Sequence, residues 1–322
     1  MVEGLTTTPA PPEFGTLPVE EVPCPFCEEA NGRQLSAPYG RFGVVKCRRC
    51  GLVRLSPRPT AAAARRLYEA AYYDAGGYDD YVATFERFRP LYEKLFARRL
   101  ALLERHLPAA PGRLLECGCA HGFQLDWLRR RGWEVVGNDL SATASSYARD
   151  RLGLEVLEGP LEEAALPPGH FDAAYLLDLV EHLYRPEEAL ANVRRALKPG
   201  GVLLAQVPYE LFHWEKRGQA LWEGKAVGTI MPDAVPYHVM YFTPRTLRLL
   251  LEKYGFRILG RHSGNYGAVR KRLSPPRLRG DSALETAARL IYYKLGLREA
   301  LRTLAVWFKQ GSGVIYAATP TR

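Results

Sequence analysis

Four of the six cysteines fall into two closely spaced pairs near the start of the chain. The pairs are Cys24-Pro-Phe-Cys27 and Cys47-Arg-Arg-Cys50, and nineteen residues separate them. Two such turns can direct four thiolates at one tetrahedral metal ion, with a hairpin between them. The spacing predicts a zinc ribbon in which Cys24, Cys27, Cys47 and Cys50 bind a structural zinc. A closed four-sulfur site has no open coordination position, so we expect no catalysis from this metal.

Two disulfides or a redox-active pair are the other interpretations of the same cysteines. Disulfides are disfavoured because we expect a cytoplasmic protein. The N-terminus lacks a basic segment followed by an apolar one, and no apolar run approaches the roughly 18 residues of a spanning helix. A redox pair is disfavoured because neither pair lies in a thioredoxin-like βαβ context.

A glycine-rich turn follows the apolar stretch that begins at Arg113. The turn is Glu116-Cys-Gly-Cys-Ala-His-Gly122, and a helix-like segment follows it. Gly118 and Gly122 permit backbone conformations that side chains hinder, and Ala120 is almost as small, so a cofactor can lie against bare backbone. A dinucleotide fingerprint requires glycine at positions 120 and 123, where this chain has alanine and phenylalanine.

A second short apolar strand runs from Trp133 and closes on Asp139. Both oxygens of a carboxylate at this place can accept hydrogen bonds from the two hydroxyls of a ribose. Asp139 could instead cap the next helix, but Ser141 is an equally good cap. In combination with the glycine-rich turn, we favour the ribose role.

The order of these motifs resembles that of class I S-adenosylmethionine-dependent methyltransferases, whose first motif usually has glycine where this chain has Ala120. The run from Phe171 to Pro208 strengthens the resemblance. It contains an acid at Asp178, a Glu181-His182 pair, a Lys-Pro-Gly-Gly turn and a strand ending in Val-Pro. With the ribbon, most of the chain is similar to the zinc-ribbon-bearing methyltransferases, a group that includes deoxysugar C-methyltransferases.

The resemblance implies that S-adenosylmethionine binds beside the carboxyl ends of the strands. Family members often have an acid after the glycine of the third-strand loop, which meets the adenine amino group. Pro160 follows that glycine here, so Glu162 or the Leu161 backbone is expected to substitute. The residues expected to hold the cofactor are Glu116, Gly118, Cys119, Ala120, Gly122, Phe123, Asp139, Leu140, Leu161, Asp178 and Leu179.

Two histidines follow predicted strands toward the same face of the domain. Methyl transfer depends on alignment of the acceptor, and a base is required only when the acceptor must lose a proton. We hypothesise that His238 is that base and that His182 orients the substrate. Acceptor binding is expected from Tyr72, Tyr73, Tyr237 and Tyr241.

The acceptor implied by the resemblance is a small molecule or a glycan, methylated at carbon or oxygen, and a nucleotide-linked sugar is one such case. The deoxysugar enzymes have an acid before the second histidine, where this chain has Tyr237. The acceptor of this protein can therefore differ from theirs.

Alternating strands and helices predict a parallel sheet covered on both faces. Under the resemblance this is the Rossmann-like, seven-stranded α/β sheet of class I methyltransferases. We expect a disordered tail over 1–19, the ribbon over 20–59, a helical linker or lid over 60–108, and the methyltransferase domain over 109–322. A helical insertion over 263–310 precedes the last strand.

Residues 283–308 place apolar side chains at helical spacing with Arg and Lys between them. Three uses remain open: a cap on the core, a dimer interface, or a basic helix on an anionic membrane. Packing against protein is the favoured one. The sequence does not specify the oligomeric state.

The formal net charge of +9 and the Arg48-Arg49 pair motivate an alternative, an RNA methyltransferase whose ribbon binds RNA. Nucleic acid is nevertheless disfavoured as a partner. Asp178-Leu-Val-Glu181 occupies the place of the Asn-Pro-Pro-Tyr-like motif of base-methylating enzymes. A binding protein with a vestigial cofactor site is a third interpretation.

Overall fold

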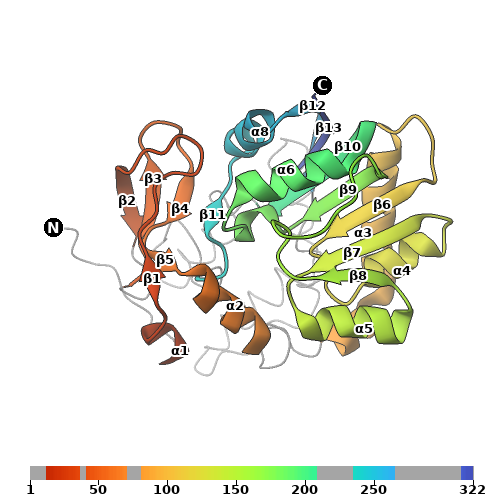
Figure 1. Ribbon diagram of the computed structural model, residues 1–322, viewed down its shortest axis with the longest axis horizontal. Helices are drawn as coiled ribbons and strands as arrows, with labels where there is room; N and C mark the ends of the chain where they lie inside the picture. Colours follow the sequence, from red (N-terminus) through yellow and green to blue (C-terminus); the bar gives the residue numbers. More distant parts are fainter. Residues whose placement is uncertain (1–11, 37–40, 71–80, 209–234, 265–312, 322) are drawn as a thin grey trace, which may run out of the picture.

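The protein consists of a large α/β domain and a smaller β module at its side (Figure 1). The computed structural model describes residues 12–36, 41–70, 81–208, 235–264 and 313–321. Tyr72, Tyr73 and the predicted helix at 283–308 lie outside the described residues. In the described part of the chain, no helix is long and apolar enough to cross a bilayer.

A seven-stranded sheet forms the centre of the large domain, in the order β12-β13-β10-β9-β6-β7-β8. Six of its seven strands run in the same direction, and β13 runs antiparallel to its neighbours β10 and β12. The predicted seven-stranded sheet is confirmed. The strands are β6 (Arg113–Cys117), β7 (Glu134–Asp139), β8 (Glu155–Glu158), β9 (Phe171–Leu177), β10 (Leu197–Pro208), β12 (Phe256–Gly264) and β13 (Gly313–Pro320).

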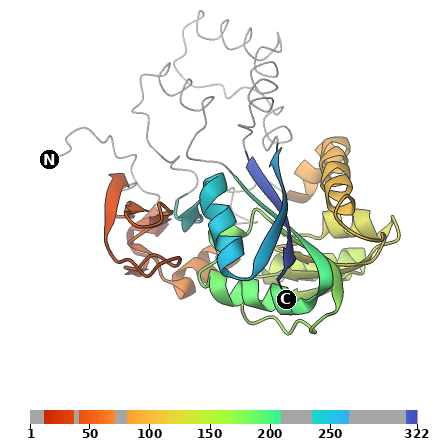
Figure 2. The ribbon, with the colours of Figure 1, turned by 90° about the horizontal axis from the view of Figure 1, so that it is seen from above.

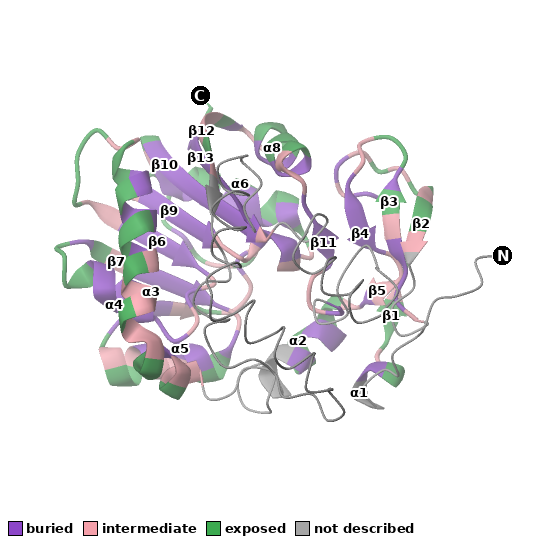
Figure 3. Ribbon diagram, turned by 180° about the vertical axis from the view of Figure 1, so that it is seen from behind, coloured by how far each residue is buried: buried purple, intermediate pink, exposed green. Residues whose placement is uncertain are grey.

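Helices cover both faces of this sheet (Figures 1 and 3). Alternation of side chains along each strand assigns neighbours to opposite faces: Leu114 packs with α3 and α4, and Leu115 packs with α6. Strands buried on both faces are nearly continuous apolar runs, which is why they were predictable. The helices are α3 (Tyr81–Glu104), α4 (Phe123–Arg129) and α5 (Ala142–Leu152) on one face, and α6 (Pro186–Ala196) and α8 (Pro244–Lys253) on the other.

The smaller β module is the predicted ribbon, and one of its strands comes from elsewhere in the chain. Its four-stranded sheet has the order β11-β4-β3-β2, and β1 and β5 form a separate two-stranded antiparallel sheet. The fourth strand, β11, belongs to the segment just before α8. The bounds are β1 (Val19–Glu20), β2 (Gly32–Ser36), β3 (Val44–Cys47), β4 (Val53–Leu55), β5 (Arg58–Pro59) and β11 (Met240–Tyr241).

The expected disordered tail is wrong for residues 12–19. They contain the short helix α1 (Pro12–Gly15) and the start of β1. Phe14 is buried and lies edge-on to Tyr237, with ring centroids 6.3 Å apart. Phe14 buries its ring in the apolar cluster of the ribbon, a contact that a segment without apolar periodicity does not indicate.

The predicted linker contains two helices, α2 (Ala61–Ala70) and α3. Thr60 precedes α2, and its side-chain oxygen accepts a hydrogen bond from the Ala63 amide at 3.3 Å. Helix α3 is interrupted at Phe88, two residues before Pro90, because proline cannot donate the helical hydrogen bond. Figure 2 shows α3 and the ribbon at opposite ends of the molecule.

Candidate functional site

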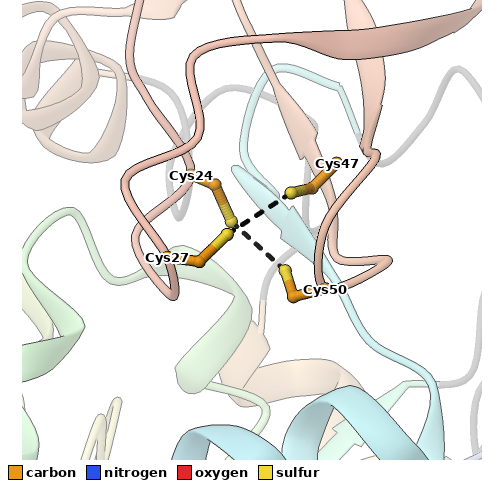
Figure 4. A group of neighbouring side chains, drawn as sticks. All are labelled: Cys24, Cys27, Cys47 and Cys50. Carbon is orange, nitrogen blue, oxygen red and sulfur yellow. Dashed lines mark hydrogen bonds between the residues drawn. The ribbon is translucent and has the colours of Figure 1, made fainter.

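The four ribbon cysteines converge on one point (Figure 4). All four sulfurs lie within 4.8 Å of one another, and the two shortest separations are 3.4 Å for Cys24–Cys50 and 3.5 Å for Cys27–Cys47. A zinc ion with tetrahedral bonds of about 2.3 Å holds its sulfurs about 3.8 Å apart, whereas a disulfide requires about 2.05 Å. The donor set fits a four-coordinate zinc, and the cysteines form no disulfides.

Each Cys-x-x-Cys turn is tightened by its own backbone. The amides of Cys27 and Glu28 both donate to the Cys24 carbonyl, and the Gly51 amide donates to the Cys47 carbonyl. Burial raises the pKa of the Cys24 thiol. Burial also acts to raise the pKa of Cys47, but backbone hydrogen bonds from Cys50 and Arg49 outweigh it and hold that pKa at about 7. Metal binding would require all four thiols to lose their protons.

The glycine-rich turn lies at the carboxyl end of β6, beside the ends of β7 and β9. Gly118, Ala120 and Gly122 all have positive φ, at 73°, 49° and 76°. A Cβ on Gly122 would lie 2.6 Å from the Leu154 side chain, so glycine is required there for space as well as for conformation. Ala120 adopts the left-handed conformation that the family's usual glycine accepts without strain.

Asp139 ends β7 and faces this turn. One carboxylate oxygen accepts a 2.7 Å hydrogen bond from the Ala120 amide, and the other accepts a 2.9 Å bond from the Ser141 amide. Burial raises the pKa of Asp139, and these amide bonds oppose the rise. Ser141 itself caps α5 through the Ala144 amide, so the alternative role proposed for Asp139 is already filled. Each carboxylate oxygen has further acceptor capacity for a ribose hydroxyl.

Glu116 belongs to a buried polar network behind the turn. Gln124 donates to Glu116 at 2.7 Å and accepts from the Arg99 guanidinium at 2.9 Å. Arg99 also lies 3.8 Å from the Asp178 carboxylate, to which Gln206 donates at 3.3 Å. Burial raises the pKa of Glu116 to about 8, and the positive charge of Arg99 limits the rise. The network joins three predicted strand ends to α3.

Sequence reasoning missed Arg99 because α3 was interpreted as a linker helix. A signal was present: Arg99 lies on the same helical face as Phe96, Leu100 and Leu103, and all four are buried. An arginine on an apolar face requires a buried anion. The start of α3 also reaches the turn, where Tyr81 stacks on His121 with ring centroids 5.1 Å apart.

The remaining residues predicted for the cofactor have different surroundings. The Phe123 ring is buried and stacks on Phe85 with centroids 3.9 Å apart, and Cys119 is buried beside it. The carbonyl of Leu161 accepts a bond from Asn192, and Glu162 accepts one from the Arg185 amide. Leu140 and Leu179 are half-buried. Contacts of these residues with a cofactor stay predictions.

His182 and His238 come together from separate segments. His182 ends a single helical turn, η2 (Val180–His182), four residues after Asp178, and His238 precedes β11. Their rings are perpendicular, with centroids 4.6 Å apart. His182 Nδ1 lies 3.0 Å from the Tyr237 carbonyl, which can only accept, so Nδ1 carries the proton and Nε2 the lone pair. Burial and the nearby His238 hold the pKa of His182 well below its usual range.

Glu181 adds a carboxylate to the histidine pair. Its side chain is buried, and each of Glu181, His182 and His238 offers a ligand atom within 4.8 Å of the others. The set has the donors of a divalent-cation site and also those of a proton-accepting pair with an acidic neighbour. The backbone joins the two segments, since the Val239 amide donates to the Glu181 carbonyl at 2.9 Å.

The two described tyrosines of the predicted acceptor site lie between the ribbon and the large domain. Tyr241 is 2% exposed and packs in one apolar cluster with Val53 and Leu55 of β4. Tyr237 packs at the edge of the same cluster. Their roles in acceptor binding stay predictions, as do those of Tyr72 and Tyr73.

Comparison with known families gives one match over more than half of the chain: residues 85–260 match the model of a methyltransferase domain. Among curated proteins, a ubiquinone biosynthesis O-methyltransferase of Azoarcus sp. (strain BH72) is 34% identical over 122 residues, which is 36% of this chain and 52% of that protein. A fatty-acid O-methyltransferase of Mycolicibacterium smegmatis is 33% identical over 141 residues, which is 39% of this chain and 51% of that protein. The chain spans about half the length of these relatives.

A solved structure with a similar fold is phosphoethanolamine N-methyltransferase 2 of Haemonchus contortus in complex with S-adenosyl-L-methionine. It superposes with a TM-score of 0.52 at 17% identity, and the match covers 84% of this chain and 63% of that one. At this identity the likeness concerns the fold.

Proposed function

The chain belongs to the methyltransferase-domain family, and we propose that it transfers the methyl group of S-adenosylmethionine to carbon or oxygen of a small-molecule or glycan acceptor. The observation that carries the proposal is the placement of the histidine pair. His182 and His238 lie together, and His182 follows Asp178 by four residues. The side chain of Leu179, in the same segment as His182, lies against Gly118 of the turn expected to hold the cofactor.

Cofactor binding is supported by the geometry of the turn and the acids around it. Three positive-φ residues at alternate positions, Gly118, Ala120 and Gly122, expose backbone at the end of β6. Asp139 offers carboxylate oxygens for a ribose. S-adenosylmethionine has a sulfonium and an ammonium group, and the carboxylates of Asp139 and Asp178 give this edge of the sheet a negative character. When bound, the cofactor supplies the electrophilic methyl group.

The protein's own contribution to the reaction is alignment and removal of a proton. A low pKa keeps His182 neutral and makes it a weak base, which suits a group that orients its neighbour. We therefore assign proton abstraction from the acceptor to His238. Glu181 supplies, from another segment, the carboxylate that the deoxysugar enzymes have before the second histidine, and it would stabilise the imidazolium.

The relatives' names indicate oxygen as the acceptor atom of their own reactions. Their similarity to this chain extends over 122 and 141 residues and supports the common cofactor domain. The resemblance to the deoxysugar enzymes instead points to sugar carbon. We retain both acceptor atoms in the proposal, and structural zinc in the ribbon forms part of it.

The test is methyl transfer from labelled S-adenosylmethionine to a panel of phenols, fatty acids, nucleotide sugars and RNA. We expect turnover with one of the small-molecule classes. Labelling of RNA alone would contradict the proposal, as would failure of calorimetry to detect binding of S-adenosylmethionine. Asp150→Asn, an exposed change on α5, is the matched control for variants of Asp139.

A further inference from the structure

We propose that the zinc ribbon is a positioning element of the acceptor site, because it holds both segments that carry His182 and His238. The inference rests on the proposed function for what the histidines do. It concerns which part of the chain keeps them in place, and it gives Leu55 and Arg58 positioning roles.

The first contact joins β4 to the His238 segment. The Leu55 amide donates to the Val239 carbonyl at 3.0 Å, and the ladder continues with Arg54 opposite Met240 and Val53 opposite Tyr241. On its other side, the Val239 amide donates to the Glu181 carbonyl. The peptide next to His238 is therefore fixed between the ribbon and the segment of His182.

The second contact joins the ribbon to the chain just after His182. The Arg58 guanidinium lies over the Tyr184 ring, 4.3 Å from its centroid, and donates to the Glu20 carboxylate at 2.9 Å. Both Glu20 and Arg58 belong to the β1–β5 pair of the ribbon. A cation over an aromatic ring at this distance contributes about 0.5–2 kcal/mol, depending on its burial.

The cysteine turns anchor the ribbon in the core of the large domain. Lys253 at the end of α8 donates to the Phe26 carbonyl at 2.8 Å, and the Phe26 ring lies 6.3 Å from that of Phe242. Cys24 and Cys47 are buried in the same apolar cluster as Val239 and residues of α6 and α8. Loss of the metal held by the four cysteines would therefore loosen the apolar cluster against which the His238 segment packs.

The cofactor turn has a different set of supports. Its observed hydrogen-bond partners are Asn138 and Asp139 of β7 and Gln124 of α4, and Gln124 in turn accepts from Arg99 of α3. These elements lie on the side of the large domain away from the ribbon (Figure 2). Disturbing the ribbon should therefore impair the histidine pair and spare the cofactor.

The experiment compares Arg58→Met, Cys27→Ser and the control Lys46→Met, whose side chain is exposed on β3. Zinc content, affinity for S-adenosylmethionine, kcat and the imidazole carbon–hydrogen NMR signals of His182 and His238 are measured for each. We expect Arg58→Met to lower kcat about tenfold with the cofactor affinity unchanged within twofold. Cys27→Ser should lose zinc and lower kcat further. Both variants should shift the two histidine signals, and Lys46→Met should shift neither.

Unchanged histidine signals in Arg58→Met and in zinc-depleted Cys27→Ser would overturn the inference, as would an equal loss of cofactor affinity and kcat. Arg58→Lys keeps the cation and should restore part of the lost kcat. If Cys27→Ser does not fold, the histidine signals and kcat of Arg58→Met alone test the inference. A wild-type protein without turnover on any acceptor would contradict the proposed function, whereas the histidine signals would still test the positioning role.

Discussion

The proposed cofactor half and the proposed acceptor half of this site are built in different ways. The cofactor half is made where β6, β7 and β9 end, and each contribution is a short run of sequence directly after a strand. The acceptor half combines η2, the segment before β11, and the ribbon, which are joined by backbone hydrogen bonds and one cation–aromatic contact. One half therefore depends on local motifs and the other on how distant segments pack.

Replacing the proposed base should separate the two halves most strongly. His238→Ala removes the group that accepts the proton, so we expect kcat to fall by about 10²–10⁴. The affinity for S-adenosylmethionine, measured by calorimetry, should change less than twofold. His182→Ala should have the smaller effect on kcat. Near-wild-type turnover in both variants would show that the acceptor needs no histidine base.

The complementary change affects the cofactor half. Asp139→Asn removes a charged acceptor of ribose hydroxyls and also turns an amide group toward the Ala120 amide. We expect the affinity for S-adenosylmethionine to weaken about 10–100-fold, in line with about 1.5–3 kcal/mol for a charged hydrogen bond. The histidine NMR signals should stay in place. If Asp150→Asn weakened binding equally, the ribose role would be wrong.

The buried network should be visible in the pH dependence of stability. The pKa of Glu116 is about 8 in the folded protein, above its usual value of 4.5. Between these values the folded protein retains a proton that the unfolded chain has released, so stability falls as pH rises, by about 1.4 kcal/mol per unit.

Glu116→Gln does not titrate and should remove this slope from urea unfolding measured between pH 5 and 8. The matched control is Glu134→Gln, whose side chain is 74% exposed. An unchanged slope in Glu116→Gln would show that Glu116 is ionised throughout this range.

The smallest effect, a change in stability, is expected at Ala120, where the glycine-rich turn has alanine in place of the usual glycine. Ala120 pays roughly 1–2 kcal/mol for its left-handed backbone, while glycine costs about 0.4–1 kcal/mol through the freedom of the unfolded chain. Ala120→Gly should therefore raise the free energy of unfolding by about 1 kcal/mol or less. Ala120→Val should lower it, because a β-branched residue tolerates positive φ poorly. Equal stability of the two variants would place Ala120 in a relaxed conformation.

The same contrast explains what could be predicted from the sequence. The glycines at 118 and 122 and the acid that ends β7 each have a local physical cause, and the structure contains them at the expected strand ends. The seven strands were predictable because burial on both faces makes them continuous apolar runs.

The acceptor half gave weaker signals. The pairing of β11 with β4 is made by backbone groups, which every residue has. No pattern of side chains in the sequence therefore predicts this pairing. Phe14 and Arg99 each depend on one contact with a distant segment. The histidine pair was predicted to lie on one face, but the carboxylate of Glu181 beside it became evident only from the packing of η2 against the chain before β11.

The placement of β13 has a consequence for how the protein is made on the ribosome. This strand is formed by residues 313–320, yet it lies inside the sheet between β10 and β12. Until it emerges, β10 has an open edge and β12 lacks its neighbour in the sheet. The sheet therefore cannot close before residues 313–320 have been made, and nascent chains halted before residue 313 should expose a strand edge that chaperones can recognise.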